Sequence, residues 1–153
     1  MPIKINGIMY NHPLGMNLYG LNWAKDNIRN FEKAIVFESE KSVLQYMTKF
    51  GIDNSIAVAC CGSNLSFFQV NQLVSCGAKE IIIAYDKQYK QVNDEEYLKW
   101  IKKLKSFYTK YASFVKISYI LDKKDILGYK DSPIETTTEN FLTLFKERII
   151  LWK

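Results

Sequence analysis

The sequence predicts an α/β domain with a mainly parallel, four-stranded central sheet and helices on both faces. Four short apolar runs alternate with longer segments in which apolar residues recur at helical spacing, a pattern typical of βαβ crossovers. The runs are nearly continuous, as expected for strands covered on both faces. The 153 residues correspond to one domain, and a composition of 48% hydrophobic and 24% charged residues excludes disordered and fibrous proteins.

The first predicted strand, residues 33–38, divides the chain into two parts. Residues 1–32 are rich in Asn, Gly and aromatic residues, and they predict an irregular lead-in segment with a short helix or turn near 26–30. Residues 33–153 then predict the α/β domain itself, because every strand-like run and most of the helical periodicity lie there.

The cycle of strand and helix repeats along the domain. Ser39 is a suitable N-cap for a first helix, and Gly51 is a suitable end for it. Further strands are predicted at residues 55–59, 80–85 and 114–120, and further helices at 66–74, 95–111 and 138–151. On the long helix the predicted apolar stripe comprises Tyr97, Ile101, Leu104, Tyr108 and Tyr111.

Charge and cysteine content narrow the classes of function. The net charge of +5 and pI near 9.0 favour an acidic or phosphate-bearing partner, although a run of lysines such as that at 99–110 is more often a solvated helix face than a nucleic-acid path. Cys60, Cys61 and Cys76 form no CxxC motif, so we expect no zinc site and no disulfide framework. No apolar run is long enough for a membrane span or a secretory signal, and we expect a cytoplasmic protein with no membrane partner.

Two carboxylates lie at the carboxyl ends of predicted strands, where parallel α/β proteins bind their ligands. Glu38 ends the first strand and Asp86 follows the third. Ligands of parallel sheets bind beyond the carboxyl ends of the strands, so these side chains can converge on one spot. Carboxylate oxygens are ligands that Mg²⁺ prefers, together with water and substrate phosphates. The sequence therefore predicts a cation-dependent phosphoryl-transfer site, which we expect to include one further acid from residues 122–131.

Several segments, in order and spacing, resemble the Toprim domain of bacterial and phage-type, DnaG-like DNA primases. The resemblance covers roughly residues 14–150. The segments that carry it are LYGLNWAKDNI (18–28), AIVFESEKSVLQY (34–46), IAVACCGSNLS (56–66), IIIAYDKQY (81–89) and LDKKDILGYKDSPIE (121–135). The second of these looks like the glutamate motif of that family, and the fourth looks like its aspartate motif.

The resemblance implies a Toprim fold for residues 33–153 and a role for each matching residue. Glu38 would be a general acid/base or metal-linked group, and Asp86 the first aspartate of a metal-binding pair. The further candidate ligands for Mg²⁺ or Mn²⁺ are Gln88, Asp125 and Asp131. The candidate phosphate or nucleic-acid contacts are Lys87, Lys90 and Lys130, which lie beside these groups in the sequence.

The implied activity is that of a DNA primase, a nucleotidyltransferase that synthesises RNA primers from NTPs on single-stranded DNA during replication. In such a primase a replicative helicase is contacted through parts absent from this chain. A complete primase would also need a zinc-binding module and a further basic domain, neither of which fits in 153 residues. We therefore expect either a fragment or a stand-alone relative, and we expect the isolated chain to fold but to be inactive.

The chain also departs from the family pattern, and the departures keep two alternatives open. Ser39 stands where the family has Gly, Ser42 where primases commonly have Asp, and Gln88 where the second aspartate of the pair is expected. The loss of that charge favours a degenerate, non-catalytic Toprim module that binds nucleic acid or a partner protein. A receiver-like domain phosphorylated on Asp86 is the third possibility, but Glu38 and the 18–28 segment argue against it.

Overall fold

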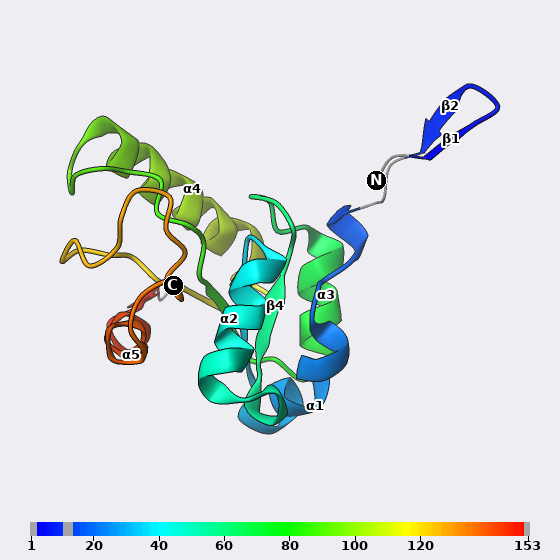
Figure 1. Ribbon diagram of the computed structural model, residues 1–153, viewed down its shortest axis with the longest axis horizontal. Helices are drawn as coiled ribbons and strands as arrows, with labels where there is room; N and C mark the ends of the chain where they lie inside the picture. Colours follow the sequence, from blue (N-terminus) through cyan, green and yellow to red (C-terminus); the bar gives the residue numbers. More distant parts are fainter. Residues whose placement is uncertain (1–2, 11–13, 152–153) are drawn as a thin grey trace.

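The computed structural model describes residues 3–10 and 14–151, which form one α/β unit and a small separate hairpin (Figure 1). The central sheet has five strands in the order β4-β3-β5-β6-β7. Four of them pair in parallel, and these are β3 (Lys33–Phe37), β4 (Ala57–Ala59), β5 (Glu80–Ile83) and β6 (Lys116–Tyr119). The predicted parallel α/β sheet is confirmed. In the part of the chain described, no helix has both the length and the apolar character needed to cross a bilayer.

Four helices connect or follow these strands, and local capping explains where they begin and end. They are α2 (Glu40–Phe50), α3 (Phe67–Ser75), α4 (Glu95–Tyr111) and α5 (Thr138–Lys146). Ser66 caps α3 by accepting the Gln69 N–H, and the Gln69 side chain accepts the Ser66 N–H in return. Asp94 caps α4 by accepting the Tyr97 N–H at 2.6 Å. Gly51 ends α2 at a φ of 86°, which favours glycine.

The helices cover both faces of the sheet. α2 leads from β3 outward to β4, whereas α3 leads back past β3 to β5, so right-handed crossovers put these helices on opposite faces. Figure 1 shows α2 and α3 on the two sides of β4. α5 lies with α2, since the Phe141 ring packs 6.0 Å from that of Tyr46. α4 lies with α3, and the Tyr111 hydroxyl donates to the Leu65 carbonyl.

The lead-in segment is more ordered than the sequence predicts. It contains β1 (Ile3–Ile5) and β2 (Ile8–Tyr10), which form an antiparallel hairpin, then η1 (Leu14–Met16) and the helix α1 (Leu21–Phe31). The prediction of an irregular segment over 1–32 is therefore wrong for these residues. The short helix or turn predicted near 26–30 lies inside α1, but the sequence does not indicate the full length of the helix, because only two of its side chains, Ala24 and Ile28, are buried.

A close backbone contact attaches this lead-in to the sheet. Tyr19 and Ala59 exchange two backbone hydrogen bonds of 2.9 and 3.0 Å at the outer edge of β4. Gly20 follows at a φ of 84°, and a Cβ at that position would lie 3.0 Å from Val43 and 3.1 Å from the Ala57 carbonyl oxygen. Any other residue at position 20 would be strained and crowded, so the glycine lets the lead-in approach β4.

The C-terminal segment also differs from the prediction of one helix over 138–151. The helix ends at Lys146, and Ile149–Ile150 form β7, a fifth strand that pairs antiparallel with β6. Arg148 explains the change, because its guanidinium turns inward and donates to the buried Glu80 carboxylate at 2.8 and 3.2 Å. This ion pair fixes the chain beside β6, where two β-branched residues favour an extended backbone.

The buried stripe of α4 is rotated from the predicted one. Trp100 and Phe107 are buried with Tyr97, Leu104 and Tyr111, in place of Ile101 and Tyr108. Both sets fit helical spacing equally well. The difference arises because Tyr85, at the end of β5, receives the Trp100 ring at 6.4 Å and the Phe107 ring at 5.6 Å. Lys99 and Lys103, in the N-terminal half of α4, lie on the side of the helix that is near Glu38.

Candidate active site at the carboxyl edge of the sheet

Glu38 and Asp86 lie together at the carboxyl edge of the sheet. Glu38 directly follows β3. Asp86 follows β5 by three residues, and the Ala84 N–H donates to the Val36 carbonyl at 2.9 Å, so the two strands stay paired up to the site. The backbone of Asp86 hydrogen-bonds to Glu38, and the Asp86 charge acts on the Glu38 carboxyl. The structure thus brings together the two acids that the sequence singles out.

The two carboxyl groups resist ionisation. The pKa of Glu38 is raised to about 7, mainly by burial and then by the Asp86 charge, while the charge of Lys103 acts in the opposite direction. Burial likewise raises the pKa of Asp86 to about 6, and the charge of Glu135 adds to that effect. Within the described residues, Glu38 Oε1 and Asp86 Oδ1 are buried and accept no hydrogen bond. Buried polar oxygens normally have a partner, so this pair is short of positive charge.

A cavity of about 410 Å³ opens beside Glu38. Gln88 lines it from the sheet edge, and Trp100 and Lys103 line it from α4; Ser63, Glu96 and Lys99 complete the wall. This volume lies within the range of about 300–1,000 Å³ that is usual for small-ligand sites. Gln88 therefore lies on the same cavity as Glu38, and two lysines of the helix face expected to be solvated, Lys99 and Lys103, border this cavity too.

Three further charged groups act on Asp86 from the other side. Asp131 and Glu135 raise its pKa, whereas Lys41 of α2 lowers it. Lys41 forms an ion pair with Glu135, which also accepts the Ser132 N–H at 2.9 Å. Sequence reasoning assigned no role to Glu135. The Ser-x-x-Glu spacing of Ser132 and Glu135 is the local signal of this turn.

Asp131 lies near enough to Asp86 for its charge to raise the Asp86 pKa, and backbone hydrogen bonds hold it there. The Lys87 N–H donates to the Asp131 carbonyl at 2.9 Å, and the Lys130 N–H donates to the Lys87 carbonyl at 2.8 Å. These two bonds fix the 128–131 turn beside the residue that follows Asp86. The Asp131 carboxylate itself accepts the Gly128 N–H at 2.8 Å, which leaves its other oxygen available.

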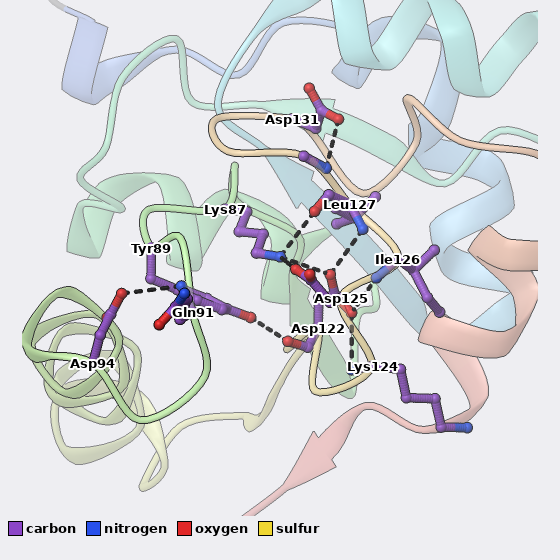
Figure 2. A network of polar contacts seen from close by, with 11 residues as sticks. Lys87, Tyr89, Gln91, Asp94, Asp122, Lys124, Asp125, Ile126, Leu127 and Asp131 are labelled. Carbon is purple, nitrogen blue, oxygen red and sulfur yellow. Dashed lines mark hydrogen bonds and ion pairs between the residues drawn. The ribbon is translucent and has the colours of Figure 1, made fainter.

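Lys87 and Asp125 are not placed as the sequence predicts. The Lys87 side chain is only 3% exposed, and its ammonium forms ion pairs with Asp122 at 3.2 Å and Asp125 at 2.6 Å (Figure 2). A lysine so enclosed cannot reach a phosphate at the surface. Asp125 is 73% exposed but directs its carboxylate to Lys87 rather than toward Asp86. Both residues support the loop that follows β6 instead of lining the cavity.

Lys90 and Lys130 are exposed and gather around one aromatic ring. Their ammonium groups lie 5.5 and 5.4 Å from the ring centre of Tyr129, which is 44% exposed. Neither lysine forms an ion pair with an acid of the described residues. Exposed cations beside an exposed ring are the combination that binds phosphates and bases of a single strand.

The donor set fits a magnesium-type cation bound with few protein ligands. Among residues 3–10 and 14–151 there is no ready-made group of three or more acidic, His or Cys ligands. Mg²⁺ is commonly held by one or two carboxylates, with waters and substrate phosphates filling the remaining positions. Two half-buried carboxyls with unpartnered oxygens, next to a cavity, match that requirement.

Comparisons with known proteins find chains of similar sequence and fold. No protein-family model matches the chain. It is 35% identical over 156 residues to the SPbeta prophage-derived uncharacterized protein YorJ of Bacillus subtilis, covering 97% of this chain and 41% of that protein. It superposes on the Aquifex aeolicus primase (zinc-binding and RNA polymerase domains) with a TM-score of 0.63 and 26% identity, over 92% of this chain and 32% of that one.

A second solved structure shows the same likeness. The DnaG primase catalytic domain bound to single-stranded DNA matches with a TM-score of 0.61 and 18% identity, over 91% of this chain and 41% of that one. The chain therefore spans about two fifths of YorJ and about a third of the Aquifex primase structure. Its fold is that of part of the DnaG primase catalytic core.

Proposed function

We propose that this chain is the Toprim part of a DnaG-type primase, which synthesises RNA primers from NTPs on single-stranded DNA with Mg²⁺ or Mn²⁺. The observation that carries the proposal is the Glu38–Asp86 pair. Two half-buried carboxyls with unpartnered oxygens end neighbouring parallel strands in a fold shared with primase cores. The 26% sequence identity to the Aquifex primase also supports this function.

Each residue of the site has a distinct part in this proposal. Glu38 and Asp86 would hold the cation, with the Gln88 amide oxygen as a neutral neighbour. A bound divalent cation neutralises charge that develops on the transferring phosphate. Glu38, whose pKa of about 7 lies close to neutrality, is suited to take up the proton of the attacking hydroxyl. Lys103 and Lys99 border the cavity and can balance the charge of a nucleotide.

The nucleic-acid strand would follow the exposed cations next to the site. Lys90 and Lys130 flank Tyr129, and the backbone bond from Lys130 to Lys87 holds this group one residue from Asp86. The net charge of +5 favours the approach of any polyanion. One solved neighbour is a primase domain bound to single-stranded DNA, which supports that ligand class for this surface.

The test is primer synthesis by the protein that carries this chain. Glu38→Gln and Asp86→Asn should each lower synthesis at least about 100-fold, as expected when a group acting in the transition state is removed. Both variants should keep their circular dichroism spectrum and should melt no lower than the wild type, because they remove charges that burial disfavours. Glu96→Gln, on the same cavity wall, is the matched control and should retain most activity.

Gln88 favours the second candidate, a Toprim module that binds nucleic acid without chemistry, because the residue brings no charge to the cavity that Glu38 lines. The same experiment separates the two functions. A wild-type protein that binds a labelled single strand but makes no primer with either cation, and whose binding is unaffected by Glu38→Gln, would be the binding module.

A further inference from the structure

The acids at the carboxyl edge of the sheet continue beyond the candidate pair. β3, β5 and β6 are neighbours, and Glu38, Asp86 and Asp122 follow them in that order. A third carboxylate at this position would ordinarily extend a cation site. Asp122 is instead only 3% exposed and does not open toward the cavity.

Both carboxylate oxygens of Asp122 already accept hydrogen bonds from the loop that follows β6. Its Oδ1 accepts the backbone N–H groups of Lys124 and Ile126, each at 3.1 Å, and its Oδ2 accepts that of Leu127 at 2.8 Å (Figure 2). Burial alone would raise the pKa of this carboxyl, but these bonds and the Lys87 charge hold it below its ordinary value. Asp122 is thus a fixed anion in the interior.

The Lys87 ammonium occupies the place where a metal ion would meet these oxygens. Its Nζ lies 3.2 Å from Asp122 Oδ2, 2.6 Å from Asp125 Oδ1 and 2.8 Å from the Leu127 carbonyl oxygen. Three oxygens from one loop therefore saturate the three N–H donors of an ammonium. Tyr89 closes the group, since its ring lies 5.0 Å from Nζ and its hydroxyl donates to the Asp122 carbonyl.

We propose that Lys87 is a built-in cation that permanently fills the Asp122–Asp125 position, so that the site takes one divalent ion, at Glu38 and Asp86, and not two. This inference rests on the proposed function and specifies its metal requirement. The tethered ammonium is present at any metal concentration. A second divalent ion would have to displace a buried, fully hydrogen-bonded charge, which is costly. Among the described residues, Glu38 and Asp86 are the carboxyl groups that have a buried oxygen without a hydrogen-bond partner.

The first test is the stoichiometry of Mn²⁺ binding to the 153-residue chain, measured by calorimetry and by the loss of the free-ion EPR signal. One ion per chain is expected. Glu38→Gln and Asp86→Asn should each remove it, whereas Asp125→Asn should leave both stoichiometry and affinity unchanged within about twofold. Asp125 is a suitable probe because its side chain is mostly exposed and its loss leaves Asp122 paired.

The outcomes separate this inference from the proposed function. Two bound ions, one of which is lost in Asp125→Asn, would overturn the built-in cation and leave the proposed function standing. No bound ion at all would overturn both.

A second test removes the ammonium while keeping the length of the side chain. Lys87→Met should bind a second Mn²⁺ at Asp122 and Asp125, and Mn²⁺ should raise its melting temperature more than that of the wild type. The additional Asp125→Asn change should abolish the second ion. A folded Lys87→Met chain that binds one ion with wild-type affinity would contradict the inference. Should that variant not fold, the wild-type stoichiometry decides alone.

Discussion

Glu38 and Asp86 share a partly desolvated corner in which both carboxyl groups favour the protonated form. Their pKa values are raised to about 7 and about 6, from ordinary values of 4.5 and 3.8. Between those limits the folded chain binds more protons than the unfolded chain. The contribution of this pair to stability is therefore highest at acidic pH and decreases as the pH rises toward neutrality. A divalent cation reverses this trend, because it stabilises the ionised pair.

The melting temperature of the metal-free chain should accordingly fall between pH 5 and pH 8. We expect each carboxyl group to lower the free energy of unfolding by about 1 kcal/mol after solvent screening, which corresponds to roughly 3 °C in melting temperature for each group. Glu38→Gln should flatten the profile, and millimolar Mg²⁺ should restore most of the loss at pH 8. Differential scanning calorimetry measures both effects. The exposed Glu139→Gln variant is the control, and a wild-type profile that rises with pH would contradict the assignment.

Position 88 allows the affinity of the proposed cation site to be changed by a single substitution. It lines the cavity with Glu38, and a carboxylate there would add a charged ligand to a site now served by two. Gln88→Asp should tighten Mn²⁺ binding about tenfold, which corresponds to about 1.4 kcal/mol. Calorimetric titration of the chain and its variant measures the change. Gln91→Asp, three residues further along, is the control, and equal affinities of Gln88→Asp and wild type would mean that position 88 does not contact the ion.

The sequence indicates where residues that directly follow a strand lie, but it does not indicate how side chains are arranged in the loop over 121–135. Glu38 and Asp86 could be paired because the carboxyl ends of adjacent parallel strands share an edge. The loop over 121–135 has no periodicity that fixes its path. Nothing in the sequence revealed that Lys87 turns inward, because lysine is almost never buried unless paired, and its partners, Asp122 and Asp125, are 35 and 38 residues away.

At the level of elements, the fifth strand depends on one buried ion pair. Glu80 is 4% exposed at the start of β5 and accepts hydrogen bonds from Ser118 at 2.7 Å and from Arg148 at 2.8 Å. Because β7 is only two residues long, its own ladder contributes little. The Arg148 side chain therefore holds the end of the chain against β6.

Arg148→Met should release β7 and leave a buried carboxylate without its main partner. We expect a destabilisation of about 3 kcal/mol, as is typical when one member of a buried pair is removed. This corresponds to roughly 6–12 °C in melting temperature for a chain of this size. Chemical denaturation measures the change. Lys99→Met, which removes an exposed ion pair with Glu95, should leave the free energy of unfolding almost unchanged, and a similar loss for both variants would refute the argument.

The elements that the sequence predicts well are those with local signals. α2, α3 and α4 begin beside good capping residues, and their bounds differ from the predicted ones by one residue or not at all. α1 and β7 lack such signals. α1 is stabilised by packing against the sheet, and β7 by the distant Glu80, so both depend on tertiary contacts that no local window contains.

At the scale of the whole molecule, the core is large enough for the chain to fold alone. The β5 isoleucines Ile81, Ile82 and Ile83 are fully buried, and the packing of both helix layers on the sheet is continuous around them. Primer synthesis needs more than a folded site. A template path, an NTP and a growing product must be held in register, and positioning provides much of the rate of phosphoryl transfer.

We therefore expect the 153-residue chain to be cooperatively folded but to make no detectable primer. Thermal unfolding followed by circular dichroism tests the first part, and incorporation of labelled NTPs on single-stranded DNA tests the second. A DnaG primase catalytic core is the positive control. Robust synthesis by the chain alone would show that it contains the complete catalytic apparatus.

The contact between Tyr19 and Ala59 has a consequence for how these molecules behave at high concentration. A sheet edge with free N–H and C=O groups can recruit a strand from another molecule and begin a fibril. Here the outer strand β4 has three residues, and Tyr19 already takes up hydrogen bonds of Ala59. At the opposite edge β7 has two residues. Each edge of the sheet is thus too short, or has its N–H and C=O groups already hydrogen-bonded, to pair with a strand of a neighbouring copy. The sheet therefore ends with its five strands.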